Sequence, residues 1–330
     1  MLQLKNNTPF AAAFALFPNE QGIDTLYTMV QGSFLIGPQW TLLEKQIEPQ
    51  KEDVYWGEPG KSSLRFSSDY HTGKSATDII MVGSACARDQ QLTRRVDVSL
   101  QVGNISKTVV VFGDRRWERD RISQPETFST MPLVYERAFG GNYYVNGQVM
   151  ATEERNPVGV GFAGGRHESE IYGAHLPNLE CPRQLIQHFQ DLPVPACFAP
   201  VAPNWLPRRS FAGTYDEEWQ TQRAPYLPDD YDPKFMNCAH PDLIYPGFLT
   251  GGEPVKIIGM HPAGELNFNL PHVNLINKIF VADKEVALKF VLEKVIFDPN
   301  QLRLSMVWRS AFECNKKALK ISQISVSMTR

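Results

Sequence analysis

The sequence has few cysteines, no long hydrophobic run and no excess of charge of one sign, and each absence excludes a class of protein. Its five cysteines are an odd number at wide spacings, which suits neither a disulfide framework nor a C-x-x-C metal site. No segment reaches the roughly 18 to 20 apolar residues that a membrane-spanning helix needs. The 33 basic residues are spread among 36 acidic ones, so a direct nucleic-acid partner is not expected.

The composition is that of a folded, soluble chain. Hydrophobic residues make up 42% of the 330 residues and charged residues 21%, and a chain of this size buries roughly three quarters of its unfolded surface. The apolar stretch 9–17 is short, with only Lys5 before it and no convincing cleavage site. We therefore expect the mature protein to begin near Met1 and to stay in the cytoplasm.

The sequence also lacks the usual signatures of an enzyme. G-x-S-x-G, H-E-x-x-H and the phosphate-binding G-x-x-x-x-G-K-[ST] are absent, and the glycine-rich segment 159–165 has neither the strand before it nor the helix after it that a nucleotide site needs. His240 and Asp242, with His175 and His261, could in principle bind a metal. The proline between His240 and Asp242 is expected to direct their side chains along an extended segment, so loop histidines with ordinary hydrogen bonds are the favoured interpretation. Adjacent carboxylates such as Glu153 and Glu154 could suggest a glycosidase, although neighbouring side chains generally point apart. We expect no catalytic residue, cofactor or metal.

Alternating apolar residues predict β-structure in the first and last thirds of the chain. In the first third the predicted strands are 26–36, 78–86, 93–102 and 106–112, and the Gly103-Asn104 pair predicts a tight hairpin between the last two. We interpret this third as a meander of antiparallel strands. The last third predicts strands at 255–260, 266–270, 286–297, 302–308 and 318–328.

The middle third has most of the 24 prolines and no sustained period. It is too rich in aromatic residues for a flexible linker, so we expect an ordered but irregular region. Short helices are predicted at 181–190 and at 216–223, the second with Asp216 or Thr214 as its N-cap. The predicted fold is mainly β: antiparallel sheets, sandwich-like, in a single unit 1–330. Within it we expect an N-terminal β region at 1–119, an irregular loop-rich region at 120–250 and a C-terminal β region at 251–330.

Seven motifs in a fixed order are too particular to come from propensity alone. They are W-G-E-P at 56–59 with S-S-L-R and S-D after it, V-F-G-D-R at 111–115 with Trp117, M-P-L-V-Y-E-R-A-F-G-G at 131–141, N-P-V-G-V-G-F at 156–162, L-P-N-L-E at 176–180, A-G-T-Y-D at 212–216 with Trp219, and L-T-G-G-E-P at 249–254. This series resembles a bacterial domain-of-unknown-function family found beside spike and toxin genes of type VI secretion systems. The resemblance runs from about residue 9 to 271, and the tail beyond Asn274 matches less clearly.

The resemblance implies an adaptor or chaperone without enzymatic activity. Such a protein binds a cognate toxic effector and helps to load it onto the spike protein, so the effector and the spike are the expected partners. The alternatives are an unrecognised enzyme acting on carbohydrate or lipid, or a structural component of the secretion apparatus.

The motifs and the loop aromatics supply the candidate site residues. Glu136 and Arg137, between aromatic neighbours, predict a partly buried ion pair or a network that braces the loops. Aromatic residues carry much of the energy in protein interfaces, so loop aromatics are the candidate partner contacts. The full candidate set is Glu136, Arg137, Phe139, Tyr143, Tyr144, Trp205, Tyr215, Asp216 and Trp219.

Overall fold

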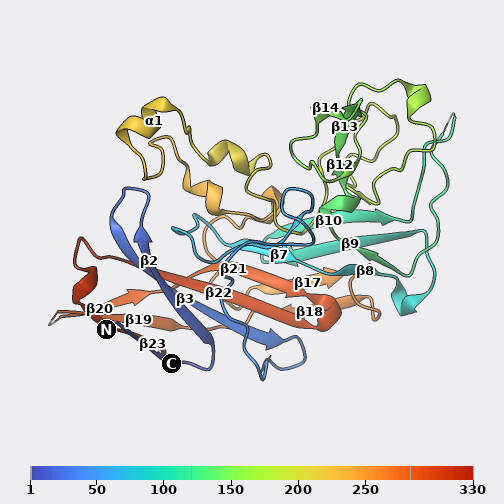
Figure 1. Ribbon diagram of the computed structural model, residues 1–330. Coiled ribbons are helices and arrows are strands. Elements are labelled where there is room, and N and C mark those ends of the chain that lie inside the picture. Colours follow the sequence, from blue (N-terminus) through green and yellow to red (C-terminus); the bar gives the residue numbers. More distant parts are fainter. Residues whose placement is uncertain (1, 120, 283, 330) are drawn as a thin grey trace.

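The central element of the fold is a six-stranded sheet that combines strands from both ends of the chain (Figure 1). The computed structural model describes residues 2–119, 121–282 and 284–329. The sheet order is β2-β3-β22-β21-β7, with β4 beside β3, and all pairings are antiparallel except that of β21 with β7. The strand bounds are β2 (Ala11–Pro18), β3 (Asp24–Leu35), β4 (Thr41–Leu42), β7 (Asp78–Met81), β21 (Val291–Asp298) and β22 (Arg303–Glu313).

Two further sheets also join distant segments of the chain. The four-stranded sheet has the order β1-β23-β19-β20, with bounds β1 (Gln3–Asn7), β19 (Leu275–Val281), β20 (Lys284–Lys289) and β23 (Ile321–Met328). The five-stranded sheet has the order β16-β10-β9-β17-β18, with bounds β9 (Arg95–Val102), β10 (Ile105–Phe112), β16 (Leu179–Glu180), β17 (Pro254–Ile258) and β18 (Glu265–Asn269). Four small ladders pair β5 (Val54–Tyr55) with β6 (Leu64–Phe66), β8 (Ser84–Cys86) with β11 (Thr130–Pro132), β12 (Phe139–Gly140) with β15 (Val160–Gly161), and β13 (Asn142–Val145) with β14 (Gln148–Thr152).

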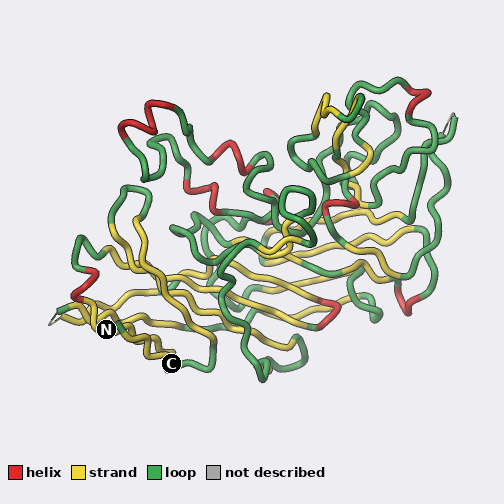
Figure 2. The backbone as a smooth tube through the Cα atoms, in the orientation of Figure 1, coloured by secondary structure: helices red, strands yellow, loops and turns green. Residues whose placement is uncertain are grey.

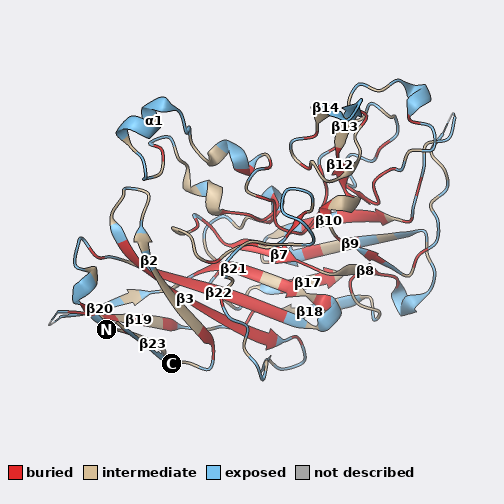
Figure 3. Ribbon diagram, in the orientation of Figure 1, coloured by how far each residue is buried: buried red, intermediate tan, exposed pale blue. Residues whose placement is uncertain are grey.

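Both smaller sheets pack on the same face of the six-stranded sheet. Along β3 alternate residues share a face. Thr28 receives a hydrogen bond from Asn277 of the four-stranded sheet at 2.9 Å, while Phe34 packs through Trp40 against Phe268 of the five-stranded sheet. The interior of β3 and most of β22 are buried on both faces, as Figure 3 shows, so this sheet forms the centre of the molecule.

The opposite face of the central sheet carries buried charges. Lys74 pairs with Asp78, Lys294 with Asp69 at 2.6 Å, and Arg309 with Glu293 at 2.5 Å, and all six side chains are at most 3% exposed. The three cations balance the three carboxylates, which buried ions require. Burial alone would raise the pKa of Asp78, but the adjacent Lys74 ammonium holds that pKa below its ordinary value. The network anchors the irregular segment 67–74 to the sheet.

The fold is mainly β with antiparallel sheets, as predicted, and most predicted strands are present. The antiparallel pairing of β9 with β10 confirms the hairpin at Gly103. The expected meander is wrong, because β7 pairs in parallel with β21 while β8 pairs with β11. The predicted strand 78–86 is interrupted by Gly83, whose φ of 123° bends the chain. The predicted strand 286–297 is two strands, β20 and β21.

One predicted helix is present and the other is absent. Asp216 caps α1 (Glu217–Gln222) by accepting the Trp219 amide at 2.9 Å, which confirms the N-cap. The segment 181–190 is not a helix, because side-chain carboxylates take the amide protons that a helix would use. Glu180 accepts from the Ile186 amide at 2.8 Å, and Asp191 accepts from the next two amides.

The middle third forms two projections on one side of the sheets (Figures 1 and 2). One carries α1, and the other carries the β13–β14 hairpin. Eight short 3₁₀ turns lie along the described chain: Arg88–Gln90, Tyr135–Arg137, Glu168–Glu170, Arg208–Phe211, Pro233–Met236, Pro241–Leu243, Pro299–Gln301 and Ala318–Lys320. Among the residues that the structure describes, every helix is too short or too polar to cross a lipid bilayer.

Candidate functional site

The structure distributes the nine candidate residues over four places. Glu136 and Arg137 brace loops near the five-stranded sheet, and Phe139 and Trp205 lie in the interior. Tyr143 and Tyr144 are on the β13–β14 hairpin. The last three, Tyr215, Asp216 and Trp219, lie together around α1.

Glu136 and Arg137 hold separate loops and do not pair with each other. The Glu136 carboxylate accepts from the Ser63 amide at 2.6 Å and from the Ser63 hydroxyl at 2.7 Å. Arg137 donates to Asn178 at 2.9 Å and lies 3.8 Å from Asp114, with the two charged side chains 38% and 48% exposed. The network that braces loops is therefore observed. The ion pair of Arg137 is with Asp114 instead of Glu136, and both of its members are partly exposed.

Phe139 and Trp205 pack in the interior. Phe139 is 1% exposed and packs with Leu176 and Ile186 in a small second core beneath the hairpin projection. Trp205 is 2% exposed, and its ring meets the Tyr135 ring edge-on at 5.4 Å. Neither side chain offers a surface to a partner in this structure.

The β13–β14 hairpin exposes four apolar side chains, which we call the hairpin surface. Tyr144 and Val149 are opposite each other in the ladder and are 56% and 53% exposed, and Val145 and Met150 are 39% and 60% exposed. Both strands lack a third neighbour among the described residues, so each has a free edge. Tyr143 turns inward, where Gly164, with φ of 63°, lets the following turn pack against it.

The α1 projection has a second exposed aromatic group. Tyr215 is 54% exposed and packs against Trp219 with ring centroids 4.7 Å apart. The Trp219 indole donates to the Tyr226 carbonyl at 2.8 Å, and the Tyr226 ring packs on Gly22 in the turn between β2 and β3. The α1 projection is thus fixed to the central sheet.

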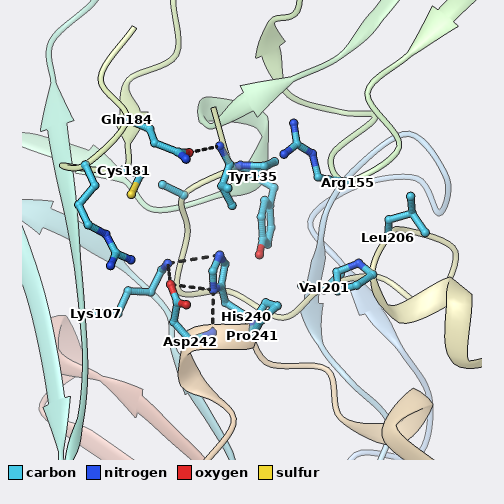
Figure 4. Close-up of a pocket in the computed structure, with 15 residues that line it drawn as sticks. Lys107, Tyr135, Arg155, Cys181, Gln184, Val201, Leu206, His240, Pro241 and Asp242 are labelled. Carbon is cyan, nitrogen blue, oxygen red and sulfur yellow. Dashed lines mark hydrogen bonds and ion pairs between the residues drawn. The ribbon is translucent and has the colours of Figure 1, made fainter. Parts of the chain in front are cut away.

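A cavity of about 360 Å³ lies where the middle third meets the five-stranded sheet (Figure 4). Its polar wall comes from Lys107 on β10, from Tyr135, and from the 3₁₀ turn that follows His240. Its rim carries Arg155 and Arg183. The remaining wall is largely apolar and is formed by Val194, Pro195, Ala196, Val201, Leu206 and Pro207. Small-molecule sites share this combination of an apolar wall with a few converging polar groups.

Three polar side chains meet in the wall of the cavity. The Lys107 ammonium, whose side chain is only 6% exposed, donates to the Asp242 carboxylate at 3.0 Å and lies 3.2 Å from Nε2 of His240. Burial and the Lys107 charge lower the pKa of His240 to about 4, so the imidazole is neutral at neutral pH. Burial alone would raise the pKa of Asp242, but the hydrogen bond and charge of Lys107 hold it below its ordinary value.

The Tyr135 hydroxyl is the unusual group in this cavity. Tyr135 is 1% exposed, and its hydroxyl has no hydrogen-bond partner among the described residues. Figure 4 shows the hydroxyl directed toward the side of the cavity that His240 and Pro241 form. A buried hydroxyl without a partner costs about 1 to 3 kcal/mol.

The histidines lie in loops and turns, and one expectation about them is corrected. Among the described residues, no three His, Cys, Asp or Glu side chains are grouped to hold a metal ion. His261 accepts a hydrogen bond from the nearby Ala263 amide at 3.2 Å, as an ordinary loop histidine does. We expected the proline between His240 and Asp242 to separate their side chains. Instead they lie 3.5 Å apart and converge on Lys107, because the turn at Pro241 folds the segment back.

Sequence reasoning missed Lys107 and Tyr135 as a pair. The signal was present at Lys107, which shares a strand face with Val109 and Val111 and is therefore a lysine at a core position. Nothing in the sequence places Tyr135 at the same cavity, because Tyr135 lies on a 3₁₀ turn outside the sheet that carries Lys107.

Comparison with known proteins identifies a family for most of the chain. The sequence profile of a family described as an uncharacterized protein conserved in bacteria (DUF2169) matches residues 21–309. The match continues past residue 271, where we expected the resemblance to weaken, and includes β21 and most of β22. No curated protein and no solved structure matches the chain.

Proposed function

The chain belongs to DUF2169, a family of uncharacterized proteins conserved in bacteria, and from this premise we propose that it is an effector adaptor of type VI secretion. In this proposal it binds one toxic effector in the cytoplasm and carries it to the spike protein, without catalysing a reaction. The ordered series of seven motifs supports the proposal, since it resembles a family encoded beside spike and toxin genes.

The observation that carries the proposal is the hairpin surface. Tyr144, Val145, Val149 and Met150 place apolar area on a projection instead of in the core. Exposed apolar groups that gather on one element are typical of protein interaction sites. The free strand edges of the hairpin also offer backbone donors and acceptors to an added strand from the partner.

The α1 projection lies on the same side of the sheets as the hairpin projection (Figure 1). A stable complex buries on the order of 1,200 to 2,000 Å² in total, more than one short hairpin supplies. We therefore assign the exposed ring of Tyr215 to the same interface. Trp219 and Asp216 position this ring through packing and the helix cap.

A deletion strain tests the adaptor role. Loss of the protein should lower the cellular level or the secretion of one cognate toxin, while spike release and the secretion of other cargo continue. Normal handling of every toxin would refute the proposal. Loss of spike release would instead favour a structural component of the apparatus, and loss of an activity on carbohydrate or lipid would favour an enzyme.

A surface variant tests the site. The double substitution Tyr144→Thr with Val149→Thr removes the apolar pair of the hairpin surface and keeps strand-forming residues. Co-purification with the toxin should weaken at least tenfold, because central aromatic contacts carry most interface energy. Leu319→Ser is the matched control, since Leu319 is fully exposed on the 3₁₀ turn Ala318–Lys320, which is not part of the hairpin surface. Equal loss in both variants would contradict the assignment of the hairpin.

A further inference from the structure

The cavity beside Lys107 is a separate feature from the proposed partner surface, and it has a polar group without a partner. The Tyr135 hydroxyl is buried, lines the cavity and receives no hydrogen bond from, and donates none to, the described residues. The Tyr135 ring is held in place by Trp205, edge-on at 5.4 Å, so the hydroxyl position is fixed. A fixed, unpartnered donor in the wall of a cavity is suited to an acceptor on a ligand.

The charges around the cavity indicate the sign of that ligand. Lys107 is balanced by Asp242, and Arg155 is balanced by Glu153, to which it donates at 2.6 and 2.7 Å. Arg183 also lines the cavity and has no ion-pair partner within 4.0 Å among the described residues. The lining therefore has one unbalanced positive charge, which favours a single negative charge on the ligand.

The shape and the remaining chemistry narrow the class further. A cavity of about 150 Å³ holds a benzene molecule, so about 360 Å³ is sufficient for a ring-sized apolar group with a polar head. Asp242 in the wall repels a dianion such as phosphate more strongly than it repels a monoanion. The apolar residues from Val194 to Ala196 and around Leu206 provide contact for a hydrophobic body.

We propose that this cavity binds an organic carboxylate with a hydrophobic body, with Tyr135 donating to the carboxylate and Arg183 supplying the balancing charge at the rim. A free organic acid and the C-terminal carboxylate of a peptide share this chemistry. The site lies within the isolated chain, so its test is independent of the adaptor role.

Titration calorimetry with the purified full chain tests the proposal with two pairs of probes. The first pair is hydrocinnamate and its neutral amide, and the second is a blocked peptide ending in phenylalanine, as the free acid and as the C-terminal amide. In at least one pair the acid should bind, and its amide at least tenfold more weakly. The pair that binds more tightly identifies the source of the carboxylate. Inorganic phosphate should bind more weakly than either acid.

Two tyrosine variants provide a matched comparison. Tyr135→Phe removes only the hydroxyl and should weaken acid binding by about tenfold to a hundredfold, the effect of losing a hydrogen bond to a charged group. Tyr27→Phe removes another buried hydroxyl without a partner, on β3 and outside the cavity, and should bind like the unmodified protein. Neither change should lower the melting temperature, since neither hydroxyl makes a hydrogen bond to the part of the chain that the structure describes.

Arg183→Gln gives a second variant that does not touch the core, because Arg183 is exposed. It should weaken acid binding and leave binding of the amide unchanged. The proposal is overturned if no acid binds at about millimolar concentration, or if acid and amide bind equally in both pairs. It is also overturned if phosphate binds more tightly than both acids. Finally, it is overturned if the Tyr135→Phe and Arg183→Gln variants both bind the acid as tightly as the unmodified protein does.

Discussion

Replacing Asp78 by Asn should strongly destabilise the protein, because it removes one charge from the buried network and keeps the shape of the side chain. Asp78 pairs with Lys74 and accepts hydrogen bonds from the Cys238 amide at 2.8 Å and the Asn237 side chain at 3.0 Å. Both charged side chains are at most 1% exposed, so no water can replace the lost carboxylate. Breaking a buried pair in this way costs about 3 to 5 kcal/mol. Total stabilities are about 5 to 15 kcal/mol, so the loss is a large share.

Urea unfolding followed by tryptophan fluorescence measures this cost. The control is Asp97→Asn, which removes one member of the Arg95 pair, about half exposed, and should cost about 1 kcal/mol or less. The double variant Asp78→Asn with Lys74→Met should be less destabilised than the sum of the single variants, because it leaves no buried charge alone. If Asp78→Asn cost no more than the control, or if the double variant were simply additive, the reasoning from buried charge would be refuted.

Three other predictions concern particular side chains, each measured as a free energy of unfolding in urea. His240 has a pKa of about 4 in the folded state and about 6.5 in the unfolded state, so the unfolded state binds more protons between these pH values. Stability should therefore fall by up to about 3 kcal/mol as the pH drops from 6.5 to 4. The His240→Gln variant should show a smaller fall in stability, and an equal fall would contradict the assignment to His240. Trp205→Ala should cost about 3 to 5 kcal/mol because the Trp205 ring is buried, whereas Tyr215→Ala should cost less than about 1.5 kcal/mol because the Tyr215 ring is exposed. A larger cost for Tyr215→Ala than for Trp205→Ala would place Tyr215 in the core. Gly113→Ala should cost more than about 3 kcal/mol, since the added Cβ would lie 1.8 Å from the Glu126 carbonyl oxygen. Gly147→Ala should cost about 1 to 2 kcal/mol, because the added Cβ meets no neighbour but the backbone φ of 80° is unfavourable for alanine. Similar costs for both variants would show that the backbone near Gly113 shifts to relieve the clash.

Strand positions could be predicted from the sequence because they depend on local alternation. β3 and the β9–β10 hairpin have apolar residues at the period of a strand, and a Gly-Asn pair marks the hairpin turn. The choice of partner strand could not be predicted in the same way. β7 pairs with β21, more than two hundred positions away, because Asp78 and the charges of β21 form one network, and no local pattern encodes that contact.

The candidate site shows the same division between local and distant information. The Asp216 cap was predictable, since the cap and the amide it accepts from are three residues apart. The roles of Arg137 and of Trp205 were not, because exposure depends on which loops cover a residue. The cavity was missed for the same reason: Lys107, Tyr135 and His240 come from three separate segments and meet only in the folded chain.

The interleaved strands have a consequence for synthesis on the ribosome. β3 needs β22, β7 needs β21 and β1 needs β23, so the early strands emerge long before the strands that pair with them. Until then β3 has only β2 and β4 as neighbours, and its apolar face is open to other chains. Folding of the central sheet must therefore wait until β22 leaves the exit tunnel, and a nascent chain of this protein keeps unpaired apolar strands exposed during most of its translation.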